Sequence, residues 1–287
     1  MTVQALLLLG LAGLMHSTWN LLPKKSKDKQ VFFWLMMFAA LFFFLPLFLY
    51  MYAPIPVIGW GYIVLSGLLE ACYVLFLGAA YQHGDVSLVY PLARGSAPLF
   101  VTLIAFVFPG ERASPQGIAG ICLIVCGIYI VHLTSFAWRE LSAPLLSLRQ
   151  RASQLALLAG LFIASYSIVD KVGLRYVNPV LYIYLIYLVL VLVLAPFMLS
   201  ARRAAIISEL RESKLKIMVA SIMSLTTYLL VLFALIGNKV SYIASAREVS
   251  VVFAAILGAL VLRESFGRQK FAGSLCIFAG IVCIALS

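Results

Sequence analysis

The sequence predicts an all-α integral membrane protein with ten transmembrane helices, arranged as two inverted five-helix repeats. Of its 287 residues 64% are hydrophobic and 11% are charged, whereas about a quarter of the residues in a soluble domain are charged. Apolar stretches close to the ~20 residues that span a bilayer recur along the whole chain. The two halves also resemble each other, since a shift of 153 pairs Arg94 with Arg247 and Glu111 with Glu264. If each half crosses the membrane an odd number of times, the second half must enter from the opposite side.

The predicted spans divide the chain into two repeats of five. The first repeat, residues 1–133, contains the spans 3–22, 30–52, 58–81, 86–108 and 115–133. The second repeat, residues 154–287, contains the spans 154–174, 179–200, 214–237, 241–262 and 268–286. Each span must be a helix, because lipid offers no hydrogen-bond partner to an unpaired backbone group. The connections 134–153 and 201–213 are too short to fold alone and are predicted as loops.

The basic residues of the loops lie mainly on one side. The odd-numbered connections carry 15 Lys or Arg residues, and the even-numbered ones carry four, namely Arg112, Lys171, Arg175 and Lys239. The positive-inside rule therefore places the odd connections in the cytoplasm and both termini outside it. The segment 1–22 is not predicted as a cleavable signal peptide, because no basic residue precedes its apolar run. A multi-pass protein of the cell inner membrane is expected.

Composition excludes several other classes of protein. The net charge of +11 does not predict nucleic-acid binding, because the basic residues lie in short loops beside the spans, where anionic lipid headgroups are the expected partners. Cys122 and Cys126 share a helix face, but no His or acid accompanies them at ligand spacing. The sequence shows no Walker loop and no nucleophile–base–acid set. We therefore expect no metal, no cofactor and no enzymatic activity.

Four charged residues lie deep inside predicted spans, away from the span ends. Arg94 and Arg247 occupy equivalent positions, at a depth where a charge costs roughly 2.5–3.5 kcal/mol, so each must face a wet cavity or a partner. They are candidate clamps that hold a carboxylate, phosphate or phosphonate through bidentate hydrogen bonds, or else members of internal ion pairs. Glu248 follows Arg247, but adjacent side chains diverge on a helix, so the partner of Arg247 is expected elsewhere.

Glu70 is the deepest acid of the sequence, about twelve residues into the third span, with no basic residue within a turn. Desolvation favours its neutral form, which makes it a candidate proton carrier. Alternatively it is the counter-ion of Arg94 or Arg247. Glu248 is a further candidate for either role.

Polar and aromatic residues in other spans are candidate wall residues of a cavity. His16, Trp19 and Asn20 lie on one face of the first helix, although His16 could be a packing group and Trp19 an interfacial residue. The tyrosines with a predicted wall position are Tyr73, Tyr81, Tyr166 and Tyr228. A second tyrosine cluster near the start of the seventh span is predicted to belong to the interfacial belt, and consists of Tyr182, Tyr184 and Tyr187.

Pro91 and Pro98 interrupt the fourth span, whereas the ninth span has no proline at the equivalent positions. Prolines free carbonyls and bend helices, so the first half is predicted to have a hinge or broken helix at Arg94, or else a static kink. Glu111 and Glu264 end the fourth and ninth spans and are predicted as structural caps or members of a gate network. Small residues at short spacing predict close helix packing at Gly117/Gly120, Ala255/Ala259 and Gly273/Gly280.

The run Trp19-Asn20-x-x-x-Lys24, with Glu111 and Glu264 closing the fourth and ninth helices, resembles the drug/metabolite transporter superfamily and specifically its EamA-type members with ten helices. The resemblance covers essentially the whole chain. It implies a central cavity lined by helices of both repeats. It also implies peripheral fifth and tenth helices, through which some relatives dimerise, so that a monomer or a homodimer is expected.

Two segments, His16–Asn20 and Tyr90–Gly95, are similar to a subgroup of that family associated with phosphonate use. A shift of 147 pairs Lys24 with Lys171, for which gate or structural roles are expected. The halves differ where Asp170 replaces Pro23 and where Glu248 replaces Gly95, so ligand contacts should be asymmetric.

The sequence therefore predicts a secondary transporter that works by alternating access. Its expected substrate is a small anionic or zwitterionic organic solute, such as an amino acid, a phosphonate or a phosphorylated metabolite. The alternative within transport is a flippase or exporter for a lipid, a lipid-linked headgroup or an amphipathic drug. A polytopic membrane enzyme would need a catalytic constellation at an interface, and the sequence shows none.

Overall fold

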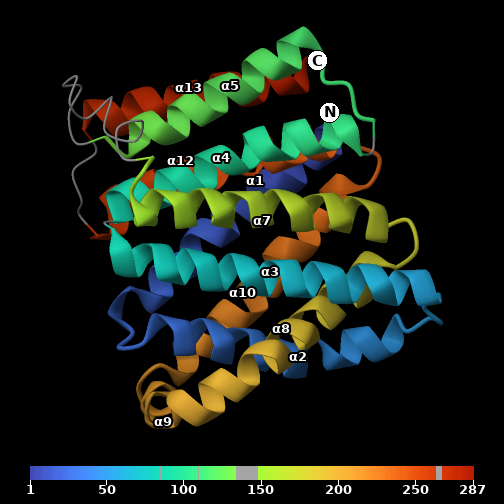
Figure 1. Cartoon of the computed structure of the whole chain (residues 1–287), viewed down its shortest axis with the longest axis vertical. Helices are drawn as coiled ribbons and strands as arrows, with labels where there is room; N and C mark the ends of the chain where they lie inside the picture. The colour runs from blue at the N-terminus through green and yellow to red at the C-terminus, as the bar shows by residue number, and fades with distance from the viewer. Residues whose placement is uncertain (85, 109, 134–147, 263–266) are drawn as a thin grey trace.

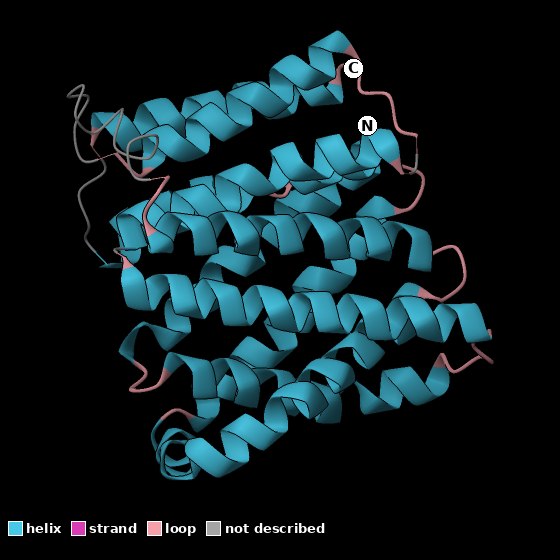
Figure 2. Ribbon diagram, in the orientation of Figure 1, coloured by secondary structure: helices cyan, strands magenta, loops and turns pink. Residues whose placement is uncertain are grey.

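The computed structural model describes residues 1–84, 86–108, 110–133, 148–262 and 267–287, and every regular element in these ranges is a helix (Figure 2). The first half contains α1 (Val3–Leu21), the 3₁₀ helix η1 (Leu22–Lys25), α2 (Lys29–Tyr50), α3 (Val57–His83), α4 (Val86–Val107) and α5 (Pro115–Val131). The second half contains α7 (Arg151–Gly173), α8 (Pro179–Ala201), α9 (Arg203–Glu212), α10 (Lys214–Leu235), α11 (Val240–Ala246), α12 (Val249–Leu262) and α13 (Arg268–Ala285). The predicted all-α class is confirmed for this part of the chain.

Short capping signals determine where several helices begin. Asn178 precedes Pro179, and its side chain accepts a hydrogen bond from the backbone N–H two residues further on at 2.9 Å. Ser114 precedes Pro115 and accepts from the backbone N–H three residues further on at 3.0 Å. Asp28 caps α2 in the same way. A side-chain acceptor satisfies a free N–H of the first turn, and proline has no N–H that would need a partner there.

Eight helical stretches in the described part of the chain are long and apolar enough to cross a membrane. Helix α5, with 17 residues, is shorter, and α1, with 19 residues, ends in the polar run His16–Asn20. Neither belongs to that set. The chain is therefore a multi-pass membrane protein, and the number of ten crossings stays a prediction.

The two ends of the bundle carry different connections. Both termini lie at one end, and α9 lies at the opposite end (Figure 1). The connection between α1 and α2 lies against α9, since Arg202 Nη1 is 2.8 Å from Asp28 Oδ2. Connections that the charge count assigns to one side of the membrane thus lie together. Which side faces the cytoplasm stays a prediction.

The two halves interleave instead of forming separate bundles. Helices α3 and α4 of the first half both pack along α7 of the second, which lies between them in Figure 1. Helix α1 packs against α10 and α12. Side chains from both halves therefore meet at the centre of the molecule.

Helices α5 and α13 pack closely on each other and lie together at one edge of the molecule (Figure 1). Glycines make this approach close, because a Cβ at Gly120 would lie 2.6 Å from the carbonyl oxygen of Gly280, and one at Gly127 would lie 2.7 Å from that of Gly273. The predicted small-residue packing is confirmed for Gly120, Gly273 and Gly280. Gly117 instead faces the ring of Tyr242 on α11.

Of the alternatives predicted at Arg94, a broken helix is wrong, whereas a hinge or a static kink stays a prediction. Helix α4 continues through Pro91 and Pro98, and the interruption occurs in the second half, where Arg247 and Glu248 separate α11 from α12. The backbone N–H of Glu248 bonds the carbonyl of the third residue before it at 3.1 Å, and two later N–H groups also bond the third residue back. This tighter 3₁₀-type turn ends α11 without any proline.

The segment 201–213 was predicted as a loop, but it contains the helix α9. The helix has a hydrophilic mean composition, and its buried residue is Glu209. Glu209 accepts a hydrogen bond from Ser26, in the connection between α1 and α2. Hydropathy does not indicate such a tertiary contact, so the helix could not be predicted from it.

Candidate functional site

Two buried arginines from equivalent positions of the two halves lie around one buried carboxylate. Arg94 on α4 places its Nε 3.3 Å from Oε2 of Glu248, and Arg247 places its Nε 3.7 Å from Oε1 of the same side chain. The Glu248 side chain is 1% exposed, and the two arginine side chains are 12% and 13% exposed. The clamp residues that the sequence predicted are thus together, and both contact the same acid.

The partner of Arg247 is therefore its own neighbour in sequence, and the expectation of a partner elsewhere was wrong. That expectation assumed a regular helix, on which adjacent side chains diverge by about 100°. The turn between α11 and α12 removes this constraint, so Arg247 and Glu248 can face the same centre. Glu248, and not Glu70, is the nearest acid to both arginines.

The arginines keep unused hydrogen-bonding capacity. Nε of Arg94, Nε of Arg247 and Oε2 of Glu248 are buried and have no hydrogen-bond partner in the described structure, although they lie in ion-pair range. Each guanidinium has five N–H donors. With all three groups ionised, this Arg94–Glu248–Arg247 cluster has a net charge of +1, which favours an anionic group beside it.

A row of tyrosines adjoins this cluster. The ring centroids of Tyr73 and Tyr166 are 6.3 Å apart, and those of Tyr166 and Tyr228 are 6.4 Å apart. Nη2 of Arg247 lies 3.4 Å from the Tyr166 hydroxyl. Three of the four tyrosines that the sequence placed on a cavity wall are therefore neighbours, on α3, α7 and α10.

The three polar residues of α1 have different surroundings. His16 lies within electrostatic range of both arginines, and its ring is 5.0 Å from that of Trp19. Trp19 also packs against Phe33 of α2, and its Nε1 is buried without a partner among the described residues. Asn20 donates from its amide to the carbonyl of His16 at 2.8 Å. The structure thus brings His16 to the arginines, whereas the Asn20 amide bonds its own helix.

Asp170 is a buried acid that sequence reasoning did not include in the site. Its carboxylate accepts hydrogen bonds from the hydroxyls of Ser66 at 2.5 Å, Tyr182 at 3.1 Å and Tyr228 at 2.5 Å. The residue is 2% exposed. The signal that could have indicated it is the replacement of Pro23 by an acid near the end of an apolar span.

Tyr182 and Tyr187 are buried, so their predicted place in the interfacial belt is wrong. Tyr182 has no exposed surface and donates to Asp170, and the hydroxyl of Tyr187 lies 3.0 Å from that of Ser224. Tyr184 is half-buried and stacks on Phe48. The start of α8 packs against α2 and α3, and this tertiary contact covers the two tyrosines.

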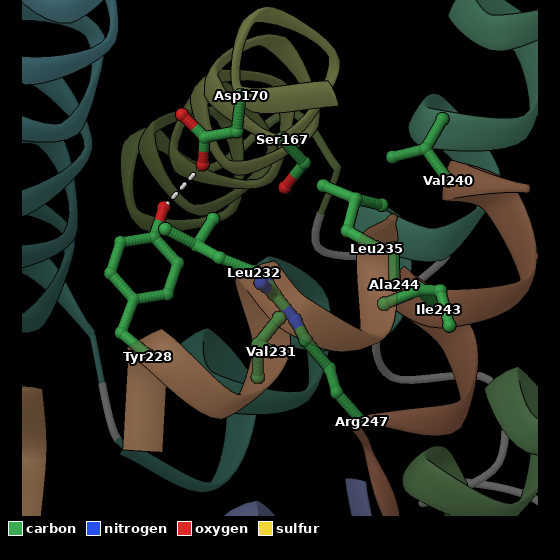
Figure 3. Close-up of a pocket in the computed structure, with 10 residues that line it drawn as sticks. All are labelled: Ser167, Asp170, Tyr228, Val231, Leu232, Leu235, Val240, Ile243, Ala244 and Arg247. Carbon is green, nitrogen blue, oxygen red and sulfur yellow. Dashed lines mark hydrogen bonds between the residues drawn. The ribbon is translucent and has the colours of Figure 1, made fainter. Parts of the chain in front are cut away.

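Asp170 and Arg247 reach into one small pocket, together with Ser167, Tyr228 and apolar side chains of α10 and α11 (Figure 3). The pocket has a volume of about 10 Å³, which is close to the space that one water molecule needs. An organic solute does not fit in this arrangement.

Glu70 lies near this pocket without a hydrogen bond to its buried Oε2 in the described structure. It interacts electrostatically with Asp170 and Arg247. The expected counter-ion position beside the arginines is occupied by Glu248. The role of Glu70 as a proton carrier stays a prediction.

The end of the bundle with the termini is held by contacts between loops. Glu111 accepts hydrogen bonds from the backbone N–H groups of Val240 at 2.8 Å and Ser241 at 3.4 Å, which is the geometry of a cap on α11. Nζ of Lys171 donates to the carbonyls of Leu235 at 2.8 Å and Asn238 at 2.6 Å, where α10 ends. Glu264 and the side chain of Lys24 lie outside the described residues.

The opposite end is held by the α9 junction, which consists of residues 26–28 with Arg202 and Glu209. Oε1 of Glu209 accepts from Ser26 Oγ at 2.8 Å and from the backbone N–H groups of Lys27 at 2.8 Å and Asp28 at 3.2 Å. Burial alone would raise the pKa of Glu209, but the hydrogen bonds from Ser26 and the backbone lower it below its usual value. The junction joins the two halves at this end.

Among the described residues no group of three His, Cys, Asp or Glu side chains could hold a metal ion. Cys122 and Cys126 are exposed on α5.

The fold and the site define a class: a multi-pass helical membrane protein whose two related halves surround a charged centre. The chain belongs to the EamA-like transporter family, whose model matches residues 3–133 and 150–286. The resemblance to the drug/metabolite transporter superfamily is thereby confirmed, and the protein is a membrane transporter of that type, whose expected cargo is a small molecule. The phosphonate-associated subgroup stays a prediction, as do the exact repeat boundaries.

A solved structure titled "Crystal structure of protein" is similar to this one, with a TM-score of 0.80 and 15% sequence identity. The alignment covers 100% of this chain and 98% of that chain. At this identity the similarity shows the fold alone. No curated protein matched the sequence.

Proposed function

We propose that this protein is a secondary active transporter that moves a small anionic or zwitterionic organic solute across the inner membrane by alternating access. Amino acids, phosphonates and phosphorylated metabolites have the required chemistry. The observation that carries the proposal is the Arg94–Glu248–Arg247 cluster, in which two arginines share one carboxylate. The ten crossings and the inverted relation of the two repeats are part of the same proposal.

The energetics of burial support an anionic cargo. Each buried arginine costs roughly 2.5–3.5 kcal/mol at the centre of a bilayer, and one carboxylate offsets only part of the cost of two. A solute carboxylate or phosphonate could bind both guanidinium groups in bidentate fashion, because their donors are not all used. Such a solute would contribute the missing negative charge.

The closed pocket and the contacts at both ends support alternating access. Opening toward one side would separate the α9 junction, and opening toward the other would separate Glu111 from the backbone of Val240 and Ser241. Both sets of contacts join the first half to the second. A rigid-body rotation of one half could therefore expose the arginines to either side in turn.

The test begins with a thermal-shift screen of purified protein against carboxylate, phosphonate and phosphate solutes. Hits are then measured for counterflow in proteoliposomes with wild type, Arg94→Lys and Arg247→Lys. Lysine keeps the charge but loses the bidentate geometry, so we expect counterflow to fall at least tenfold in either variant. Arg203→Lys, at an exposed position on α9, is the matched control and should transport normally.

Unchanged counterflow in both buried variants would refute the clamp role. Transport confined to uncharged amphipathic drugs, or movement of labelled lipid, would favour the exporter or flippase alternative. The orientation is tested with single cysteines at Thr2 and Ser287, which should react with an impermeant reagent in intact cells. Protection of both positions would refute the proposed topology.

A further inference from the structure

Asp170 is the centre of a second polar cluster, which the proposed anion clamp does not use. The hydroxyls of Ser66, Tyr182 and Tyr228 all donate to its carboxylate, at 2.5 Å, 3.1 Å and 2.5 Å. Ser66 belongs to α3 of the first half, and the other members belong to α7, α8 and α10 of the second. The hydrogen bond from Ser66 therefore crosses the interface between the halves, and relative motion of the halves changes it, whereas the bonds from Tyr182 and Tyr228 lie within the second half.

Two effects of opposite sign act on the protonation of Asp170. Hydroxyl donors stabilise the carboxylate, whereas burial in an apolar interior favours the neutral acid. With all three donors in place the first effect is at its largest. If α3 or α10 moves away from α7, Asp170 loses the donor Ser66 or Tyr228, and the balance changes toward proton uptake.

The charges around Asp170 couple it to the Arg94–Glu248–Arg247 cluster. That cluster has a net charge of +1 when all its groups are ionised, so an ionised Asp170 brings the centre close to neutrality. An anionic solute on the arginines adds a further negative charge, and a proton on Asp170 removes it again. Asp170 and Arg247 line the same pocket, which makes the coupling direct (Figure 3).

Titratable and charged groups approach Asp170 from every element packed around it. They are Glu70 on α3, Tyr182 on α8, Tyr228 on α10, and Arg247 between α11 and α12. Of these, Glu70 is the competing proton site, because its Oε2 is buried without a hydrogen bond in the described structure and it interacts electrostatically with Asp170.

We propose that Asp170 is the proton acceptor that couples solute transport to a proton gradient. The inference rests on the proposed function, whose cargo is anionic. Asp170 takes a proton from the aqueous phase on one side when the halves separate there. When the halves close on that side and open on the other, Ser66 donates to the carboxylate again beside Tyr182 and Tyr228, and the proton passes to water on the other side.

The geometry favours a proton over a sodium ion. Transporter sodium sites use carbonyls of unwound helices, but α7 continues to Gly173 and the carbonyl of Asp170 accepts the backbone N–H of Leu174 at 2.9 Å. The three hydroxyls direct their hydrogens at the carboxylate.

The proton site is tested without any solute. The full chain in lipid bilayers is titrated by infrared difference spectroscopy, which detects the carbonyl band of protonated carboxyl groups. We expect a titrating band that Asp170→Asn removes and that Tyr228→Phe moves to higher pH by about 1–2 units, because one strong donor is lost. Tyr187→Phe removes a buried hydroxyl that bonds Ser224 and is the matched control, with no shift expected.

A band that persists in Asp170→Asn and disappears in Glu70→Gln would overturn the proposal in favour of Glu70. A band position that depends on sodium would overturn it in favour of that ion. If Asp170→Asn does not fold, the titration of the carbonyl band in Tyr228→Phe is compared with that in Tyr187→Phe. A shift to higher pH in Tyr228→Phe alone supports Asp170 as the proton site, and equal titrations overturn it.

Coupling is then measured in proteoliposomes with a solute found in the screen. Asp170→Asn should abolish accumulation driven by a pH gradient, while counterflow without a gradient continues. Unchanged gradient-driven accumulation in this variant would overturn the coupling role. If wild type moves no anionic solute, the proposed function fails, and the infrared titration still answers separately whether Asp170 binds the proton.

Discussion

Replacing Glu248 by glutamine should destabilise the fold strongly, although the glutamine side chain has nearly the same shape as glutamate. The substitution removes the one carboxylate within ion-pair range of Arg94, at 3.3 Å, and of Arg247, at 3.7 Å. At an effective dielectric constant near 20, each such contact corresponds to roughly 4–5 kcal/mol of attraction. Measured losses are smaller because water and side chains rearrange, and removing one partner of a buried pair typically costs about 3–5 kcal/mol. Two arginines lose their partner here, so we expect a loss near the upper end of that range.

The measurement is the free energy of unfolding in detergent micelles, followed by tryptophan fluorescence against denaturant. Glu212→Gln is the control, since it removes an exposed acid paired with Lys27 and should leave the unfolding midpoint unchanged. Added phosphate should stabilise Glu248→Gln more than wild type, because an anion can replace the lost charge. A loss below about 1 kcal/mol with no effect of phosphate would show that the arginines are hydrated and do not depend on Glu248.

Three further predictions concern the ends and the edge of the bundle. Glu209→Gln should weaken the α9 junction by about 1–3 kcal/mol. Hydrogen bonds lower the pKa of Glu209, so its contribution to the free energy of unfolding is complete above the unfolded pKa of ~4.3 and is lost as pH falls through the lower folded pKa. The variant should therefore lose less stability in acid than wild type. Equal curves of unfolding free energy against pH would contradict this. Gly120→Ala should cost about 1–3 kcal/mol of unfolding free energy, because its Cβ would lie 2.6 Å from a backbone oxygen of Gly280. The control Gly61→Ala, whose Cβ would have nothing within 4 Å, should be neutral or stabilising. Equal effects of the two substitutions would refute the close packing of α5 and α13. Glu111→Gln should cost roughly 0.5–1 kcal/mol and speed hydrogen exchange at the first amides of α11, and unchanged exchange would exclude the capping role.

The parts of the fold that depend on local hydropathy could be predicted from the sequence. The start of α5 was predicted at residue 115, and the structure begins it at Pro115. Gly120, Gly273 and Gly280 were predicted as packing residues because small residues recur at short spacing along their helices. Burial in lipid makes these signals strong, since few residue types are tolerated there.

Features that depend on contacts between distant segments could not be predicted. The turn at Arg247 has no proline, and the helix α9 has no apolar run, so each is recognisable only from its tertiary partners. Asp170 was noted only as a difference from Pro23, because its three hydroxyl donors come from α3, α8 and α10. Tyr182 looked interfacial for the same reason, since the helices that bury it are remote in sequence.

The turn between α11 and α12 also limits how far the two repeats could be made identical by protein engineering. The first-half residue equivalent to Glu248 is Gly95, which lies on the unbroken α4, and a Cβ there would have Ile128 of α5 as its neighbour at 3.9 Å. An acid introduced at position 95 alone would therefore face the peripheral α5 and not the arginines. A symmetrised chain built from two copies of the first half would lack both the acid and the turn that directs it inward. The carboxylate and the irregular backbone beside it must be transplanted together.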